Sequence, residues 1–356
     1  NNSRRGILFQ HTDAYVENLN VNNNECRGSS CNGGGIGIYY SNVTIIGGEV
    51  SYNDAGFVGG GFFIRNADLF LSDMLIHHNV AGLDEMAGHG GGGINMENSS
   101  PTIVNTEIYE NNACVSMHSY CSGGGIRYKH GEGDPTIINV LIRNNYAHHA
   151  AGIRLKNPKL YNVTIVNNVA ISQTAGDKVS GNQVRVENGT IIKNSIIWND
   201  DGGVVMTDYD EGEIDGVSYS TVYGGYTGTE IQTEDPGFTG NYEATSSSCI
   251  DTGDPNLWYS DEDGTRSDIG WTRGAYISTT FNNNILEPVN EFNFGSVGGL
   301  GSFVNWRLFN FRETDMVIDG VNFNTESFST ESEFPIVIGP RETAQIAIFA
   351  NNTTLG

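Results

Sequence analysis

Two short motifs alternate along the chain from Val21 to Asn199. The first is a Gly-rich step into an apolar residue, which reads Gly-Gly-Gly-Ile in several of its copies. The apolar residues that end this step are Ile36, Phe62, Ile94 and Ile126, with weaker copies at Ile153 and Val184. The second motif is an apolar residue followed three places later by Asn, in the pairs Val21/Asn24, Val50/Asn53, Ile76/Asn79, Ile108/Asn111, Ile142/Asn145, Ile165/Asn168 and Ile196/Asn199. Self-similarity of this kind is typical of a solenoid.

Another aliphatic residue precedes each Asn of the second motif by eight places. These residues are Val16, Ile45, Leu71, Ile103, Ile137, Leu160 and Ile191. Short strands cannot bury an apolar face alone, but coils stacked about 4.8 Å apart align like side chains into a continuous core. We therefore expect a parallel β-helix with one coil per repeat. Asn tolerates the left-handed backbone of a tight corner and its amide can bond from coil to coil, so we expect the Asn column to be structural.

The alternation of Gly-Gly-X-Ile with Ile-x-x-Asn resembles the repeat of the polymorphic outer-membrane protein family, whose members are surface-displayed β-helices used in adhesion. It resembles more loosely the right-handed β-helix of pectate-lyase-like proteins. The resemblance covers about residues 16 to 200. It implies the fold but leaves activity open, because this solenoid hosts lyases, hydrolases, epimerases and adhesins.

The repeat loosens after Asn199, and the composition changes again near Ile285. Residues 216–225, 235–238 and 248–253 are similar to the closing coils of bacterial extracellular β-helix proteins. The later strands alternate with a period of two and resemble immunoglobulin-like modules found beside bacterial surface anchors. We expect an all-β chain: a right-handed parallel β-helix over residues 1–284, with closing coils from about 200, followed by an immunoglobulin-like β-sandwich over 285–356 that is incomplete at its end.

The chain is strongly acidic, with 18 Lys and Arg, 42 Asp and Glu, and a net charge of −24. Such a charge repels nucleic acid and anionic membranes. No apolar run approaches the roughly 18 residues that span a bilayer. The first ten residues lack the features of a signal peptide, so we expect a piece of a longer polypeptide with further domains.

Two cysteine pairs occupy equivalent places in their repeats. Cys26 and Cys31 enclose one short loop, and Cys114 and Cys121 enclose another. Loops rich in Ser, Gly and Asn offer no core for free thiols, so we expect a local disulfide in each and a free Cys249. Disulfides form in oxidising compartments, which favours a secreted or cell-surface protein, and the resemblances favour a bacterial one.

The strand after each Gly-rich step predicts one inward and one outward row of side chains. The inward pairs are Ile36/Ile38, Phe62/Ile64, Ile94/Met96, Ile126/Tyr128, Ile153/Leu155 and Val184/Val186. Outward, Arg127, Arg154 and Arg185 stack in neighbouring coils, with Lys129 and Lys156 alongside. Because Arg binds carboxylate and sulfate in a bidentate fashion, these five residues predict a site for an acidic polysaccharide or cell-surface glycan, a uronate or a sulfated one.

Three functions remain open at this point. Glycan binding or adhesion is preferred. In polysaccharide lyases of this fold a basic residue removes the proton beside a carboxylate, so Lys129 or Lys156 as base with Arg154 as charge stabiliser is the alternative. The third is a passive stalk, in which the basic residues are a solvated face offset by Glu97 and Glu187. Whether the chain is an enzyme is left open.

Calcium is the one cofactor that the sequence suggests. Asp261, Asp263 and Asp268 are spaced like an oxygen-ligand loop with Gly264 in its turn, although the final Glu of an EF-hand is missing. A structural turn is the equal alternative. Four histidines, His89, His118, His148 and His149, lie in variable loops without the spacing of a metal site.

Overall fold

The computed structural model describes residues 5–28, 30–83, 90–113, 121–128, 131, 133–170, 183–186, 189–199, 205–208, 214, 216–255, 259, 261, 265–272, 279–282, 285–287, 302–309, 315–323, 325–339 and 343–350. Its contacts divide the chain into two units. The first comprises Asn1–Pro255 and Arg266–Gly274, and the second comprises Asn256–Thr265 and Ala275–Gly356.

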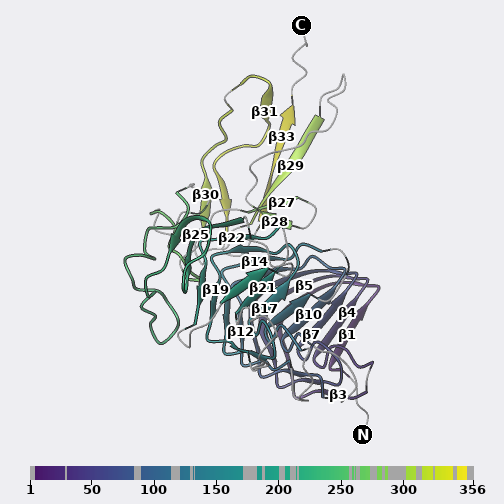
Figure 1. The fold of residues 1–356 in the computed structure, drawn as a ribbon. Coiled ribbons are helices and arrows are strands. Elements are labelled where there is room, and N and C mark those ends of the chain that lie inside the picture. The colour runs from purple at the N-terminus through teal and green to yellow at the C-terminus, as the bar shows by residue number, and fades with distance from the viewer. Residues whose placement is uncertain are drawn as a thin grey trace. The chain divides into compact units, whose positions relative to one another are not determined.

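The first unit is a parallel β-solenoid of about six turns, with strands stacked coil upon coil (Figure 1). One wall is an eight-stranded sheet that consists, in order, of β1 (Ile7–Gln10), β4 (Ile36–Tyr39), β7 (Phe62–Arg65), β10 (Ile94–Glu97), β13 (Ile126–Tyr128), β17 (Ile153–Leu155), β21 (Val184–Val186) and β24 (Met206–Asp208). Every pair in this sheet is parallel. The Gly-rich steps therefore lead into one strand position per coil, and the predicted parallel β-helix is confirmed.

A thirteen-stranded sheet forms a second wall. Its strands are β2 (Asp13–Asn22), β5 (Asn42–Ser51), β8 (Asp68–His77), β11 (Thr102–Val104), β12 (Glu107–Tyr109), β14 (Thr136–Ile138), β15 (Leu141–Arg143), β18 (Lys159–Tyr161), β19 (Thr164–Val166), β22 (Ile191–Lys193), β23 (Ile196–Trp198), β25 (Gly216–Val222) and β26 (Thr229–Gln232). Two-residue strands add small sheets: β3 (Glu25–Cys26), β6 (Asp54–Ala55) and β9 (Val80–Ala81) form one, and β16 (Tyr146–Ala147) and β20 (Val169–Ala170) form another.

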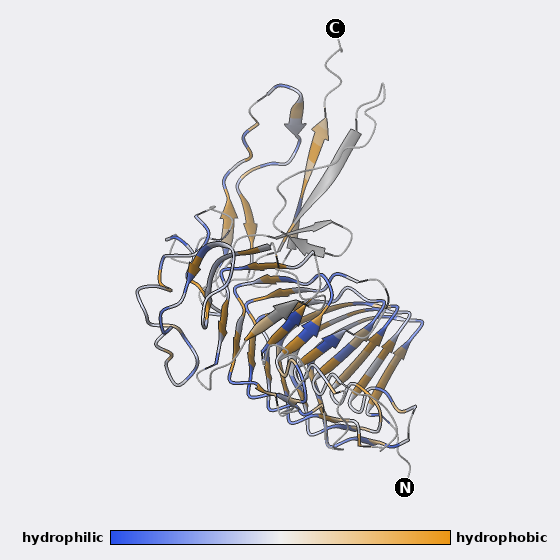
Figure 2. Cartoon of the chain, in the orientation of Figure 1, coloured by the Kyte–Doolittle hydropathy of each residue, from blue (hydrophilic) through white to orange (hydrophobic). Residues whose placement is uncertain are grey.

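The inward rows stack as the repeat predicts. Ile103 pairs in register with Ile137, and Ile137 pairs with Leu160. All three side chains are fully buried. The six apolar pairs that follow the Gly-rich steps belong to the same core cluster. In Figure 2 the strands of the solenoid are mostly hydrophobic in consequence.

The last full coil departs from the predicted column by one residue. Leu160 pairs with Ile192 rather than Ile191, and Ile165 pairs with Ile197 rather than Ile196. Ile192 and Ile197 enter the main core, whereas Ile196 packs into a second cluster with Cys249 and Trp198 among others. Each predicted residue has an aliphatic neighbour, so the pattern alone could not distinguish the two registers, and a one-residue shift exchanges the two faces of a strand.

The Asn column forms a buried hydrogen-bonded ladder, as predicted, from Asn24 to Asn168. Each Asn Nδ2 donates to the Oδ1 of the Asn in the next coil, at 2.9–3.0 Å. Asn168 donates instead to Gln183 Oε1 at 2.7 Å, so Gln183 and not Asn199 ends the ladder. The left-handed corner residue is the one that precedes each ladder Asn. These residues are Asn23, Tyr52, His78, Glu110, Asn144 and Asn167, with φ of 52–57°.

The second unit contains two small antiparallel sheets. Its strands are β27 (Thr279–Asn282), β28 (Ile285–Glu287), β29 (Ser302–Phe309), β30 (Met316–Ile318), β31 (Phe328–Thr330), β32 (Ile336–Ile338) and β33 (Thr343–Ala350). Five of them form the sheet β28-β27-β29-β33-β31, and β30 pairs with β32. Leu308, Met316, Ile338 and Ile346 form one core cluster that joins both sheets. The described part of the chain contains no α-helix, so the all-β class is confirmed.

Candidate functional site

Three arginines from neighbouring coils form a row on the outer face of the eight-stranded sheet. Arg127 on β13 pairs in register with Arg154 on β17, and Arg154 pairs with Arg185 on β21. Lys156 lies just beyond the end of β17 and is half-buried, whereas Lys129 lies outside the described residues. Figure 2 shows hydrophilic segments on neighbouring strands of this otherwise hydrophobic sheet. We call Arg127, Arg154 and Arg185 the basic row.

The outer face at this row is not the open solvated surface that strand alternation predicts. Asn95 and Phe63 precede Arg127 in register, and both are fully buried. Arg127 itself is only 8 % exposed. Arg154 and Arg185 are half-buried. The face is therefore closed at its Asn95 end and more open toward Arg185.

Glycine backbone covers the closed end. A Cβ added to Gly90 would lie 2.2 Å from Cδ of Arg127, and one added to Gly91 would lie 2.6 Å from Cβ of Asn95. Either contact is too short for a real side chain. Gly90 is held there by a bridge to Ser122 in the next coil. The Gly-rich motif thus does more than turn the chain, because its first residues pack directly on the outward side chains.

Several polar atoms under this cover have no hydrogen-bond partner among the described residues. They are Nε and Nη1 of Arg127 and both amide atoms of Asn95. Leaving such a group buried and unpaired costs about 1–3 kcal/mol, and more for a charged one. Native proteins satisfy nearly all such groups, by water or ligand where protein atoms do not serve.

The neighbours of Arg127 provide little compensation for its charge. Burial and, after it, the nearby Arg154 lower the pKa of Arg127 to about 10, while Glu97 acts in the opposite direction. Arg127 nevertheless remains a cation at neutral pH. Glu97 is 2 % exposed and accepts a hydrogen bond from Nε of Arg65 at 2.6 Å. Arg65 lies on β7, one coil further from the basic row than Glu97. Nη1 of Arg154 donates to Oγ of Ser122 at 3.0 Å.

The cysteines agree with the predicted pairing as far as they are described. Cys26 and Cys31 form a disulfide, with Cα atoms 5.7 Å apart. Cys121 is also disulfide-bonded, and Cys114, its predicted partner, lies outside the described residues. Cys249 is free and buried, and burial raises the pKa of its thiol, which makes it unreactive.

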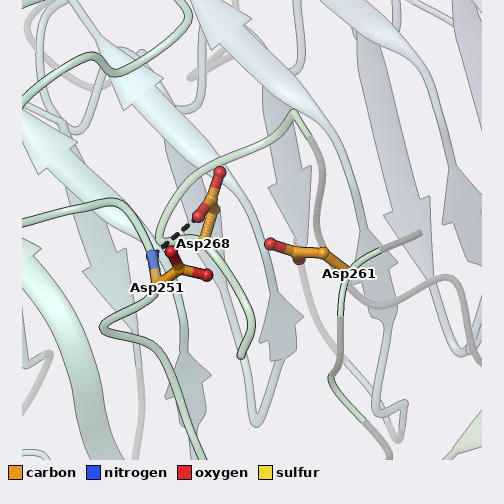
Figure 3. Close-up of side chains that lie close together, drawn as sticks. All are labelled: Asp251, Asp261 and Asp268. Atoms are coloured by element: carbon orange, nitrogen blue, oxygen red, sulfur yellow. Dashed lines mark hydrogen bonds between the residues drawn. The ribbon is translucent and has the colours of Figure 1, made fainter. Parts of the chain in front are cut away.

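The acidic segment predicted to bind calcium is divided between the two units. In the first unit, Asp268 is 5 % exposed and its Oδ1 accepts the backbone N–H of Asp251 at 2.8 Å (Figure 3). In the second, Asp261 is 4 % exposed and its backbone N–H donates to the carbonyl of Thr265 at 3.1 Å. Asp263 lies outside the described residues.

A cluster of histidines and aromatic rings lies on the outer face of the thirteen-stranded sheet and was not foreseen. His77 stacks on Tyr109 with ring centres 4.6 Å apart, and Tyr52 stacks on His78 at the same distance. Nδ1 of His77 lies 2.8 Å from Nδ1 of His78. Of the predicted loop histidines, His148 and His149 are neighbours with ring centres 6.4 Å apart, and His89 and His118 lie outside the described residues.

Comparison with models of known protein families, with curated proteins and with solved structures finds no match for this chain. No helix in the described ranges is long and apolar enough to cross a membrane. Fold and site together define a parallel β-solenoid with a partly buried row of cations on one wall.

Proposed function

We propose that the solenoid is an extracellular or cell-surface binding module that holds an acidic glycan against the basic row, with Lys129 and Lys156 alongside. The observation that carries this proposal is the register of Arg127, Arg154 and Arg185 on three adjacent coils. In a chain of net charge −24, such a concentration of cations is a local exception. Cations about 4.8 Å apart suit a polyanion that lies along the solenoid axis.

The burial of Arg127 adds to this argument. Desolvated charges bind a counter-charge more strongly than exposed ones, because water screens them less. An anionic sugar would supply the acceptors that Nε and Nη1 of Arg127 lack among the described residues. Carboxylate and sulfate groups both have the geometry that guanidinium groups bind.

The test is retention on immobilised polyuronate, sulfated glycan and neutral glycan, with Arg154→Gln and Lys156→Gln combined. We expect the double variant to weaken retention on the acidic glycans by roughly 1.5–3 kcal/mol per charged hydrogen bond lost. Retention of the parent should fall with salt, since exposed charges are screened beyond about 8 Å at physiological ionic strength. The neutral glycan should not show this dependence.

A matched control removes two cations elsewhere on the first unit. Arg27 pairs with Glu25 near the disulfide, and Lys159 lies on β18 in the other wall. Arg27→Gln combined with Lys159→Gln changes the net charge equally and should leave retention unchanged. Equal losses in both double variants would attribute binding to net charge. If the parent protein binds no acidic glycan, the passive stalk is the remaining function. If unsaturated sugar products appear, the protein is a lyase.

Secretion, the second unit and calcium extend this proposal. The Cys26–Cys31 disulfide supports an oxidising compartment. The core that joins β29, β30, β32 and β33 supports an immunoglobulin-like module in the second unit. Calcium binding by Asp261, Asp263 and Asp268 is supported by their spacing in the sequence.

A further inference from the structure

Two adjacent histidines at one corner of the solenoid direct their rings to the same place. His77 ends β8, and His78 follows it with a left-handed backbone, φ 53°. Neighbouring side chains on an extended strand point to opposite faces. The left-handed residue breaks this alternation, so the rings meet, with Nδ1 of His77 2.8 Å from Nδ1 of His78.

A carboxylate holds the far nitrogen of each ring. Nε2 of His77 lies 3.3 Å from Oε1 of Glu49 in the preceding coil, and Nε2 of His78 lies 2.6 Å from Oε2 of Glu110 in the following coil. Because a carboxylate only accepts, each Nε2 carries a proton. A neutral imidazole with its proton at Nε2 has a bare acceptor at Nδ1. In the neutral rings, the two Nδ1 lone pairs therefore face each other across 2.8 Å.

Two acceptors this close repel each other unless a positive centre lies between them. A shared proton is one such centre, and a metal ion is the other. The local charge favours the ion, because Glu49 and Glu110 together carry two negative charges, which a divalent cation balances and one proton does not. Arg143, which lies over the ring of Tyr109, pairs with a third carboxylate, that of Glu107. Carboxylates on the outer nitrogens of metal-bound histidines are also the usual arrangement, since they fix the tautomer and make the ligating nitrogen more basic.

The spacing of the two nitrogens selects the kind of ion. At metal–nitrogen distances of about 2.0–2.1 Å, nitrogens 2.8 Å apart subtend an angle of roughly 85–90° at the metal. A tetrahedral zinc site would need them about 3.3–3.4 Å apart. A right angle is typical of tetragonal sites, the geometry of Cu(II) and Ni(II), and Cu(II) is the most tightly bound of the first-row divalent ions.

The histidine pair is open to solvent on the His78 side. The side chain of His78 is 35 % exposed and that of Glu110 is 38 % exposed. Tyr52, which stacks on His78, is 51 % exposed. His77 is 7 % exposed and contacts the rings of Tyr52 and Tyr109. An ion therefore enters from the His78 side, where water fills the positions that the two nitrogens leave.

We propose that His77 and His78 form a copper(II) site, in which both Nδ1 atoms bind the ion and Glu49 and Glu110 orient the rings. The site belongs to the thirteen-stranded sheet, so it is independent of the basic row and of glycan binding. Glu49, the two histidines and Glu110 come from three successive coils. A bound ion therefore ties these coils together at the corner.

The test is copper titration of the tag-free chain, measured by calorimetry and by electron paramagnetic resonance. We expect one tight site per chain, with a tetragonal Cu(II) spectrum that shows coupling to two nitrogens. His78→Asn removes one nitrogen and should weaken this site at least about tenfold, the smallest loss expected even for an outer partner of a metal ligand. Asn fits this corner, because Asn23, Asn144 and Asn167 have the same left-handed conformation in other coils.

Two further variants separate the site from general effects of histidine or charge. His149→Gln is the matched control, because His148 and His149 are also adjacent but have ring centres 6.4 Å apart. It should leave the copper affinity and the spectrum unchanged. Glu110→Gln keeps both ligating nitrogens, so it should lower the affinity about tenfold while the two-nitrogen coupling remains. A purely structural Glu110 predicts a lower melting temperature without a loss of copper affinity.

Each outcome supports or overturns the copper site. If His78→Asn binds copper as tightly as the parent, or if the spectrum of the parent shows coupling to fewer than two nitrogens, the two histidines share a proton and hold no metal. Weak binding that His78→Asn and His149→Gln reduce equally would also overturn the site. A parent that shows the two-nitrogen site but binds no acidic glycan would overturn the proposed function and leave this inference intact.

Discussion

Nδ2 of Asn79 donates to Oδ1 of Asn111 in the next coil at 2.9 Å, and the same Nδ2 donates to the carbonyl of Val50 at 2.8 Å. Both Asn side chains are fully buried. Each ladder amide thus bonds to the coil before it and the coil after it. The ladder fixes the spacing of the coils at the corner where the left-handed residue turns the chain.

Replacing Asn111 with Ala should lower the free energy of unfolding by about 3 kcal/mol. The change removes the Nδ2 donor from the carbonyl of Ile76 and from Oδ1 of Asn145. It also leaves the backbone N–H of Asn79 without its acceptor and removes one of the two acceptors of Asn79 Nδ2. Urea denaturation measures the loss. Asn24→Ala is the matched control, because Asn24 lies at the exposed end of the ladder and should cost about 1 kcal/mol. If Asn111→Ala and Asn24→Ala lower the free energy of unfolding equally, the hydrogen bonds between ladder residues contribute no stability beyond that of a single terminal hydrogen bond.

Replacing Ile137 with Asp should prevent soluble folding. Ile137 is fully buried between Ile103 and Leu160 in the core, so the variant would bury a carboxylate without a partner. Soluble yield and thermal melting test this. Ile137→Val, which removes one methylene, should fold and lose about 1 kcal/mol. Parent-like melting of the Asp variant would contradict the stacking of these columns.

The repeat predicted the solenoid because stacked coils need like residues at like places, and one sequence column then specifies one structural row. The repeat does not determine which residue enters the core where two adjacent residues fit the pattern equally well. Ile191 and Ile192 are adjacent and identical, so the pattern could not tell which one enters the core, and the structure places Ile192 there. The Asn column was correctly interpreted as a ladder, but its left-handed corner residues are the preceding ones, which include Tyr52 and Glu110. These residues carry no turn signal of their own.

The candidate site could be predicted in register but not in burial. Alternation places Asn95 and Arg127 on the outer face, and an outer face on a solenoid wall is normally solvated. The apolar Phe63 at the same outward position was a signal that this face is covered, because a fully buried Phe needs neighbours on both sides. What covers it depends on the path of Gly90 and Gly91, which spacing alone does not reveal.

Acid should destabilise the protein through His77. Its pKa is lowered by burial first, with His78 acting in the same direction and Glu49 and Glu110 opposing. The unfolded chain therefore takes up the proton at higher pH than the folded protein, and stability falls as the pH drops below about 6.5. Melting temperatures between about pH 7 and pH 5 measure this. His77→Phe keeps the ring that stacks on Tyr109 and should flatten the dependence.

Tyr52→Leu is the control for that experiment, because it removes an aromatic ring that contacts His77 and leaves the His77 imidazole in place. It should keep the pH dependence of the parent while it lowers the melting temperature at every pH. A His77→Phe protein with an unchanged pH profile would assign the acid sensitivity to other groups.

Calcium should raise the melting temperature if Asp261, Asp263 and Asp268 hold it. A ligand that binds only the folded protein adds about 2.7 kcal/mol at a hundred times its dissociation constant. Magnesium, which demands a smaller octahedral site, should stabilise less. Asp268→Asn should abolish the calcium effect. If chelation leaves the melting temperature of the parent unchanged, the segment is a structural turn.

Replacing Arg127 with Met should raise the free energy of unfolding or leave it unchanged, and should abolish the binding of acidic glycans. Arg127 is a cation at 8 % exposure whose Nε and Nη1 lack partners among the described residues, so an apolar side chain of similar length removes a buried charge at no loss of a hydrogen bond. Replacing buried charges in this way often stabilises a protein by about 1–4 kcal/mol.

Arg65→Met is the matched contrast, since Arg65 lies on the same face two coils away and pairs with the buried Glu97. Removing Arg65 breaks an ion pair to a buried carboxylate and should cost about 3 kcal/mol or more. Urea denaturation of the two variants should therefore move in opposite directions. A loss of stability in Arg127→Met as large as that in Arg65→Met would show that Arg127 stabilises the fold. It would contradict the proposal that Arg127 destabilises the free protein and is kept there to bind an anion.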